Sequence, residues 1–223
     1  MFAVIFEVEP RKGQFDRYLE IARLLRPELE QINGFIDNER FASQRFAGRV
    51  LSLSTWRDEK AVIRWRTLAI HHRMQETGRF EVFAHYHLRV GEITADTHVP
   101  DGHTLRQQRF DETEIGAARW ASITEVSPTI ERPASTTLAA DLGLRDGDGL
   151  AGQDSFESIY NPGKGLLLAS WRDEAAANGW APQAVAHGTL RHRRVRIIRD
   201  YGMADRREAP QYYPPVEGEG RQD

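Results

Sequence analysis

Histidine and arginine alternate close to position 85, where they could form a patch of acid–base groups. His85, His87 and Arg89 occupy every second position, and alternate residues of a strand present their side chains on one face. A neutral imidazole can accept a proton near neutral pH, and a guanidinium can stabilise the oxyanion that forms. We therefore take His85 as the first candidate for a catalytic base, with His87 and Arg89 as candidate substrate-binding residues.

Two further histidines, His71 and His72, lie in a segment whose apolar residues recur at helical spacing. They are the alternative candidates for the base. Each set also has a non-catalytic explanation: the strand residues could form a polar strand face, and the helix histidines could be buried, hydrogen-bonded imidazoles. Two imidazoles at i and i+2 could also ligate a metal. No carboxylate or third histidine is securely placed near His85 and His87, so we expect no metal site.

The segment that must position these residues occurs twice. The tetrapeptide Trp-Arg-Asp-Glu begins at Trp56 and again at Trp171, and the same interval of 115 residues carries Trp65 onto Trp180. Extended without a gap, this interval carries Phe83 onto an isoleucine, and it pairs the tyrosines at 86 and 201. The tryptophans at 56, 65 and 171 and Phe83 are candidate substrate-binding residues, because large aromatic side chains bind apolar rings as well as pack.

An internal duplication sets the domain boundaries. We predict a first domain at residues 1–92, a linker at 93–118, a second and diverged domain at 119–204, and a flexible tail at 205–223 that is loosely ordered or draped over a neighbouring surface.

The first copy is predicted to run strand, helix, strand, strand, helix, strand, which is the ferredoxin-like arrangement of an α+β fold. Both helices then cover one face of an antiparallel sheet. We expect Leu51 and Leu53 to face the helices, and Trp56, Phe83 and Arg89 to lie on the open face. A face that mixes apolar and polar residues suits the wall of a ligand cavity closed by a second sheet.

Composition narrows the classes of function. The formal net charge is −3, and no basic stripe appears outside residues 191–199, so nucleic acid is a poor candidate for a partner. Cysteine is absent, which excludes disulfides and thiolate chemistry. We find neither a signal peptide nor an apolar run long enough for a membrane helix. These features predict a soluble, cytoplasmic protein.

A set of residues in the first copy carries a resemblance to a known family: Gly34-Phe35, the strand ending at Trp56, Asp58-Glu59, the run from Trp65 to His71, Gln75, Gly78-Arg79, Phe83 and Tyr86. Through them the first copy resembles the antibiotic biosynthesis monooxygenase (ABM) domain of the dimeric α/β-barrel superfamily, and the second copy resembles it in outline. In that superfamily two ferredoxin-like sheets pack open face to open face into a barrel, usually as a homodimer. A tandem repeat implies that one chain forms the barrel as an intrachain pseudo-dimer, and a further homodimer is left open. Asp200 then becomes a candidate site residue, because the interval of 115 places it at the position of His85.

The resemblance implies oxygenation of a small aromatic or quinol-type molecule by dioxygen, without a protein-bound cofactor. His71 falls where the family usually has histidine, whereas the second copy has Ala186 there, so we expect the chemistry in the first copy. The alternative is a non-catalytic binding or regulatory barrel, favoured by the eroded second copy, which leaves open whether the protein is an enzyme. Haem degradation is disfavoured because Gln75 stands where that branch has histidine, and the first strand has no asparagine.

Overall fold

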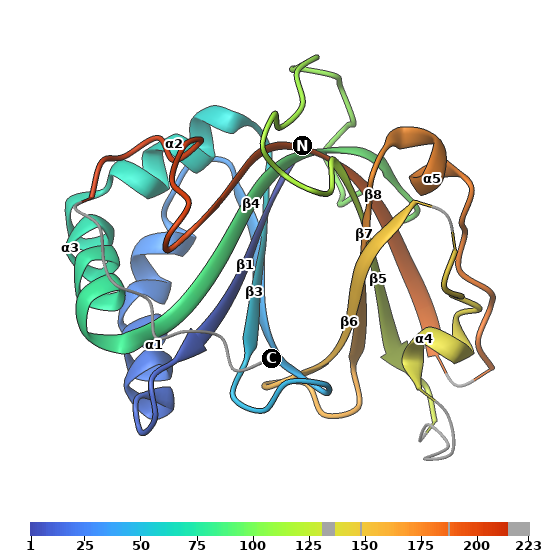
Figure 1. Cartoon of the computed structure of the whole chain (residues 1–223), viewed down its shortest axis with the longest axis horizontal. Coiled ribbons are helices and arrows are strands. Elements are labelled where there is room, and N and C mark those ends of the chain that lie inside the picture. Colours follow the sequence, from blue (N-terminus) through green and yellow to red (C-terminus); the bar gives the residue numbers. More distant parts are fainter. Residues whose placement is uncertain (131–136, 148, 187, 214–223) are drawn as a thin grey trace.

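The computed structural model describes residues 1–130, 137–147, 149–186 and 188–213 (Figure 1). The first repeat contains β1 (Phe2–Pro10), α1 (Phe15–Glu30), β2 (Phe35–Ser43), β3 (Val50–Trp56), α2 (Glu59–Thr67), α3 (Ala69–Thr77), a π-helical turn (Gly78–Val82) and β4 (Phe83–Asp96). The second repeat contains β5 (Trp120–Pro128), α4 (Leu138–Asp141), β6 (Leu150–Ser158), β7 (Gly165–Trp171), α5 (Glu174–Asn178) and β8 (Gly188–Gly202). None of the helices in these ranges is long and apolar enough to span a bilayer.

The eight strands close into one antiparallel barrel, in the order β1-β3-β2-β6-β7-β5-β8-β4. Each repeat contributes four neighbouring strands in the ferredoxin-like order, and the repeats are joined where β2 pairs with β6 and where β4 pairs with β8. Helices α1, α2 and α3 cover the outside of the first repeat, and α4 and α5 lie outside the second (Figure 1). The predicted fold, two ferredoxin-like repeats closed into an α/β barrel, is confirmed. The domain boundaries stay predictions.

The repeated Trp-Arg-Asp-Glu motif marks the junction between a strand and a helix. Trp56 ends β3, and Trp171 ends β7. Two residues later, the carboxylate of Asp58 accepts a hydrogen bond at 2.8 Å from the backbone N–H three positions on, and Asp173 accepts the equivalent bond at 2.9 Å. An aspartate N-cap stabilises a helix start by about 1 kcal/mol. The motif occurs twice because both copies need the same strand end and helix start.

The two copies lose their common spacing before the last strand. Phe2 of β1 pairs with Glu92 of β4, and Trp120 of β5 pairs with Arg196 of β8. Equivalent residues of β4 and β8 are thus 104 positions apart, so the gapless extension by 115 is wrong in this strand, and its two tyrosines are not equivalent. The cause is the helix before β8. The first repeat has α2 and α3 of nine residues each, whereas α5 has five.

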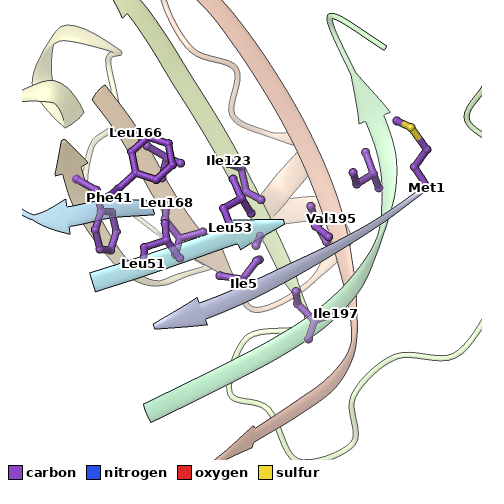
Figure 2. Close-up of a cluster of buried hydrophobic side chains, with 14 residues drawn as sticks. Met1, Ile5, Phe41, Leu51, Leu53, Ile123, Leu166, Leu168, Val195 and Ile197 are labelled. Atoms are coloured by element: carbon purple, nitrogen blue, oxygen red, sulfur yellow. The ribbon is translucent and has the colours of Figure 1, made fainter. Parts of the chain in front are cut away.

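The interior of the barrel is a packed apolar core (Figure 2). Leu51 and Leu53 of β3 meet Ile5 of β1 and Leu168 of β7 there, each of them at most 3% exposed. The prediction that these two leucines face the helices is wrong, since the alternate set of β3, which includes Trp56, takes that side. Both faces of β3 carry apolar residues. The alternation of side chains along the strand therefore separates its residues into two faces but does not indicate which face meets the helices.

Ion pairs are also buried inside the barrel. Arg89 is 3% exposed, and it donates to the Glu7 carboxylate at 2.5 Å and to the Ser170 hydroxyl at 2.7 Å. Arg193 is 1% exposed and is paired with Glu125. Buried charges are tolerated when they are paired and hydrogen-bonded in this way. The expectation of a ligand cavity between the two sheets is therefore wrong, because side chains occupy that space.

A close approach of β8 to β4 demands glycine at position 91. An added Cβ on Gly91 would lie 2.4 Å from the Val195 side chain and 2.5 Å from the Arg196 carbonyl oxygen. We expect Gly91→Ala to lower the free energy of unfolding by about 1–3 kcal/mol, the usual cost of overpacking, as measured by urea denaturation. Gly152→Ala on β6 is the control, since its Cβ would meet nothing within 4 Å. Equal losses in the two variants would contradict this account.

Candidate functional site

A cavity of about 220 Å³ lies between the helices of the first repeat and the outer face of its sheet. Strands β1 and β4 supply one wall, and α1, α2 and α3 supply the other. Its size and largely apolar lining suit a small, mostly apolar molecule. Representative apolar lining residues are Val4, Phe6, Leu25, Met74, Leu88 and Val90.

A break in the helix layer shapes this cavity. The sequence predicts one helix from Asp58 to Gly78, but Leu68 has φ −61° and ψ 127°, an extended conformation that ends α2 and precedes α3. The chain direction changes there, and the ring of His71 stacks on Trp65 with 3.9 Å between the ring centroids. Both side chains line the cavity.

His71 is held in one tautomer. Its Nδ1 lies 2.9 Å from the carbonyl oxygen of Trp65, which can only accept, so Nδ1 carries the proton and Nε2 keeps a lone pair. Burial lowers the pKa of His71 to about 4, because the charged imidazolium is poorly solvated there. The imidazole is therefore neutral at pH 7 and can act as a proton acceptor.

Phe83 also lines the cavity, although the sequence places it on the open face of the sheet. Its ring meets Phe6 and Tyr18 edge-on at centroid distances of 5.8 and 5.9 Å. A bulge in β4 accounts for the difference: Glu9 of β1 pairs with His85 and the next residue pairs with Phe83, so one residue of β4 is left over and Phe83 turns to the other face of the sheet. The cavity thus brings together three of the predicted site residues, His71, Trp65 and Phe83.

The residues of the alternating His-Arg pattern lie elsewhere. His85 and His87 border a small polar recess at one end of the barrel, together with Glu7. Nε2 of His87 is 2.5 Å from Asp200 Oδ1, a contact made because β8 lies beside β4. Arg89 is the buried ion-pair partner already described. Among the residues that the structure describes, no three histidine, aspartate or glutamate side chains converge as a metal site requires.

The remaining predicted residues pack outside the cavity. Trp56 and Trp171 are 0% and 5% exposed, and their indole N–H groups donate to Ser54 and Ser122 at 2.9 and 3.0 Å. They therefore anchor the two helix layers. His72 is partly exposed, and its Nδ1 lies 3.1 Å from the Tyr213 hydroxyl.

One end of the cavity was not predicted from the sequence. The Tyr86 hydroxyl accepts hydrogen bonds there from Arg79 at 3.1 Å and from Arg206 at 2.5 Å. Arg206 belongs to the segment after β8, which returns to the first repeat and contacts α3 through Tyr213. The feature of the sequence that points to this contact is the pair Tyr212 and Tyr213 in an otherwise polar tail, because aromatic residues anchor a segment to a neighbouring surface.

The fold and the site define a class of protein, an α/β barrel of two ferredoxin-like repeats with a small-molecule cavity beneath the helices of one repeat. The model of the antibiotic biosynthesis monooxygenase family matches residues 1–77. Jasmonate monooxygenase ABM from Pyricularia oryzae is 44% identical over 223 residues, which covers 97% of this chain and 100% of that protein. The chain belongs to the antibiotic biosynthesis monooxygenase family.

Solved structures extend the similarity of fold. Aldoxime dehydratase OxdRE, crystallised with butyraldoxime, has a TM-score of 0.58 at 12% identity, and the match covers 90% of this chain and 81% of that one. A second aldoxime dehydratase structure has a TM-score of 0.55 at 12% identity, with 88% and 80% covered. At this identity the likeness is one of fold alone.

The lowered pKa of His71 predicts a pH dependence of stability. His192, which burial and neighbouring arginines also hold at a pKa of about 4, should act in the same direction. Between pH 6.5 and 4 these two histidines bind protons in the unfolded chain but not in the folded chain. Above pH 6.5 they therefore do not lower the free energy of unfolding, and they lower it progressively as the pH falls toward 4.

Urea denaturation at pH 7 and pH 5 measures this slope. We expect His71→Asn to remove roughly half of it, since two histidines share a similar shift. An unchanged slope would contradict the burial of a neutral His71.

Proposed function

We propose that the protein is a monooxygenase that transfers oxygen from O₂ to a small aromatic or quinol-type molecule held in the cavity, with His71 as the base. The observation that carries the proposal is a neutral imidazole of fixed tautomer, Nε2 unprotonated, in an apolar cavity. Membership of a monooxygenase family supplies the class of reaction.

The reaction needs no electron donor other than the substrate. His71 removes a proton from an activated CH₂ group, such as that of an anthrone, and the resulting carbanion passes one electron to O₂. The substrate radical and superoxide combine into a peroxide, which loses water and leaves a carbonyl group. One oxygen atom enters the product and the other leaves as water, so CH₂ plus O₂ gives C=O plus H₂O.

The low pKa of His71 fits this step. Its cause is desolvation, which penalises an isolated imidazolium. Proton transfer from the substrate creates an imidazolium and a carbanion together, and their attraction in a poorly solvated site offsets that penalty. Trp65 and Phe83 supply aromatic surface for the ring of the substrate.

Oxygen uptake with a substrate panel tests the proposal. The panel contains an anthrone, a naphthoquinol and jasmonate, the compound that gives the relative its name. We expect uptake above the enzyme-free rate with at least one compound, and ¹⁸O₂ should place one labelled atom in the product. Ligand-dependent stabilisation without oxygen uptake would instead identify a binding or regulatory protein.

Substitution of the histidines locates the base. His71→Asn keeps a donor for the Trp65 carbonyl but removes the base, so the oxygen-uptake rate should fall by about 10²–10⁴-fold. His98→Asn is the matched control on the exposed surface and should retain the rate. Loss of uptake in His85→Asn, with His71→Asn active, would move the base to the end of the barrel.

A further inference from the structure

The cavity carries more positive than negative charge at one end. Arg66 of α2, Arg199 of β8 and Arg206 of the segment after β8 all line it. Among the lining residues that the structure describes, the one carboxylate is Glu59, which accepts from Arg109 at 2.7 and 2.8 Å. In the described part of the chain, no carboxylate forms an ion pair with Arg66, Arg199 or Arg206.

The positive charges of Arg66, Arg199 and Arg206 all act on Tyr201, each lowering its pKa. Arg199 and Tyr201 pair with Val90 and Leu88 of β4, which places both side chains on the helix-covered face. The guanidinium of Arg206 lies 5.6 Å from the centroid of the Tyr201 ring. The cluster therefore joins residues from both repeats at one end of one cavity.

The hydrogen-bonding groups of this cluster are incompletely used. The Nε atoms of Arg66 and Arg206 are buried and have no hydrogen-bond partner in the described structure. Burial and the neighbouring Tyr86 raise the pKa of Tyr201 to about 12, against the lowering effect of Arg66, so its hydroxyl remains a donor at neutral pH. The site offers donors and positive charge, and in the described part of the chain no carboxylate is paired with Arg66, Arg199 or Arg206.

We infer that this end of the cavity is a carboxylate-binding subsite, formed by Arg66, Arg199 and Arg206. A carboxylate presents two acceptor oxygens that match the planar fork of a guanidinium, whereas a neutral group would leave three half-buried cations without a paired anion. The ring of the same ligand would lie against Trp65 and Phe83 in the apolar part. The inference rests on the proposed use of this cavity as the substrate site, and it narrows the substrate to a small ring compound bearing a carboxylate.

Binding of jasmonate and of its methyl ester tests the subsite, because the two probes differ in charge. Isothermal titration of the full chain should show jasmonate binding at least about tenfold more tightly than the ester, and this preference should shrink in high salt. Equal affinity for the two compounds, or binding of neither, would overturn the inference.

Substitution of the cavity arginines tests which residues cause the preference for jasmonate over its ester. Arg199→Gln and Arg206→Gln should each weaken jasmonate binding by about tenfold or more and leave ester binding within about twofold. Arg172→Gln is the control, because this arginine is 67% exposed in its side chain and lies outside the cavity. Loss of jasmonate and ester binding to the same extent in both cavity variants, with an unchanged melting temperature, would refute a carboxylate contact.

The binding assay and the oxygen assay fail independently. Charge-selective binding without oxygen uptake by any panel compound would remove the proposed monooxygenase function and keep the subsite. Oxygen uptake with a neutral substrate, together with equal affinity for acid and ester, would keep the function and remove the subsite.

Discussion

The buried ion pair between Glu92 and Arg196, 2.7 Å apart, lies at the centre of the seam between β4 and β8. An isolated ferredoxin-like sheet exposes strand edges, which must be paired or covered. This seam pairs one edge of each repeat, and the shorter contact of β2 with β6 pairs the other. Glu92 also accepts a backbone N–H from Gln108 at 2.5 Å, which fastens the connection between the repeats to the seam. The register of the seam decides which residues of the second repeat reach the cavity of the first.

Closing the barrel dictates where a small molecule can be held. Apolar side chains and ion pairs fill the space between the sheets, so room for a ligand remains under a helix layer. In the first repeat, α1, α2 and α3 stand over a strand face that includes the small Ser52 and Ser54. In the second repeat the helices α4 and α5 have four and five residues, and Leu142 and Trp171 pack directly on the sheet. The longer helices are therefore the structural reason that the described cavity belongs to the first repeat.

Sequence reasoning recovered the parts of the fold that depend on local pattern. The duplication, the strand order and the strand-to-helix junctions after Trp56 and Trp171 follow from periodicity and capping chemistry. It failed where the answer depends on distant packing. The orientation of Leu51 and Leu53 depends on the position of a second sheet, and the face of Phe83 depends on a bulge in β4.

The candidate site shows the same division between local and distant information. Trp65 and Phe83 are predicted as site residues from aromatic type, which is a local feature, and His71 from the resemblance to the family, which has histidine at this position. Arg199 and Arg206 follow Trp65 by more than a hundred residues, and only the closure of the barrel brings them to its cavity. The roles of all these residues stay predictions.

A tandem chain can do what a symmetric dimer cannot, because its two halves can carry different residues at equivalent positions. The spacing of 104 between β4 and β8 makes Ala95 the counterpart of Arg199 and Thr97 the counterpart of Tyr201. The first repeat thus has a methyl group and a short hydroxyl, at and just after the end of β4, where β8 of the second repeat has a guanidinium and a phenol. In a homodimer every change at such a position would appear in both cavities. Fusion of the copies lets β8 of the second repeat supply arginine and tyrosine side chains to the cavity under the helices of the first, while β4 supplies no such pair in return.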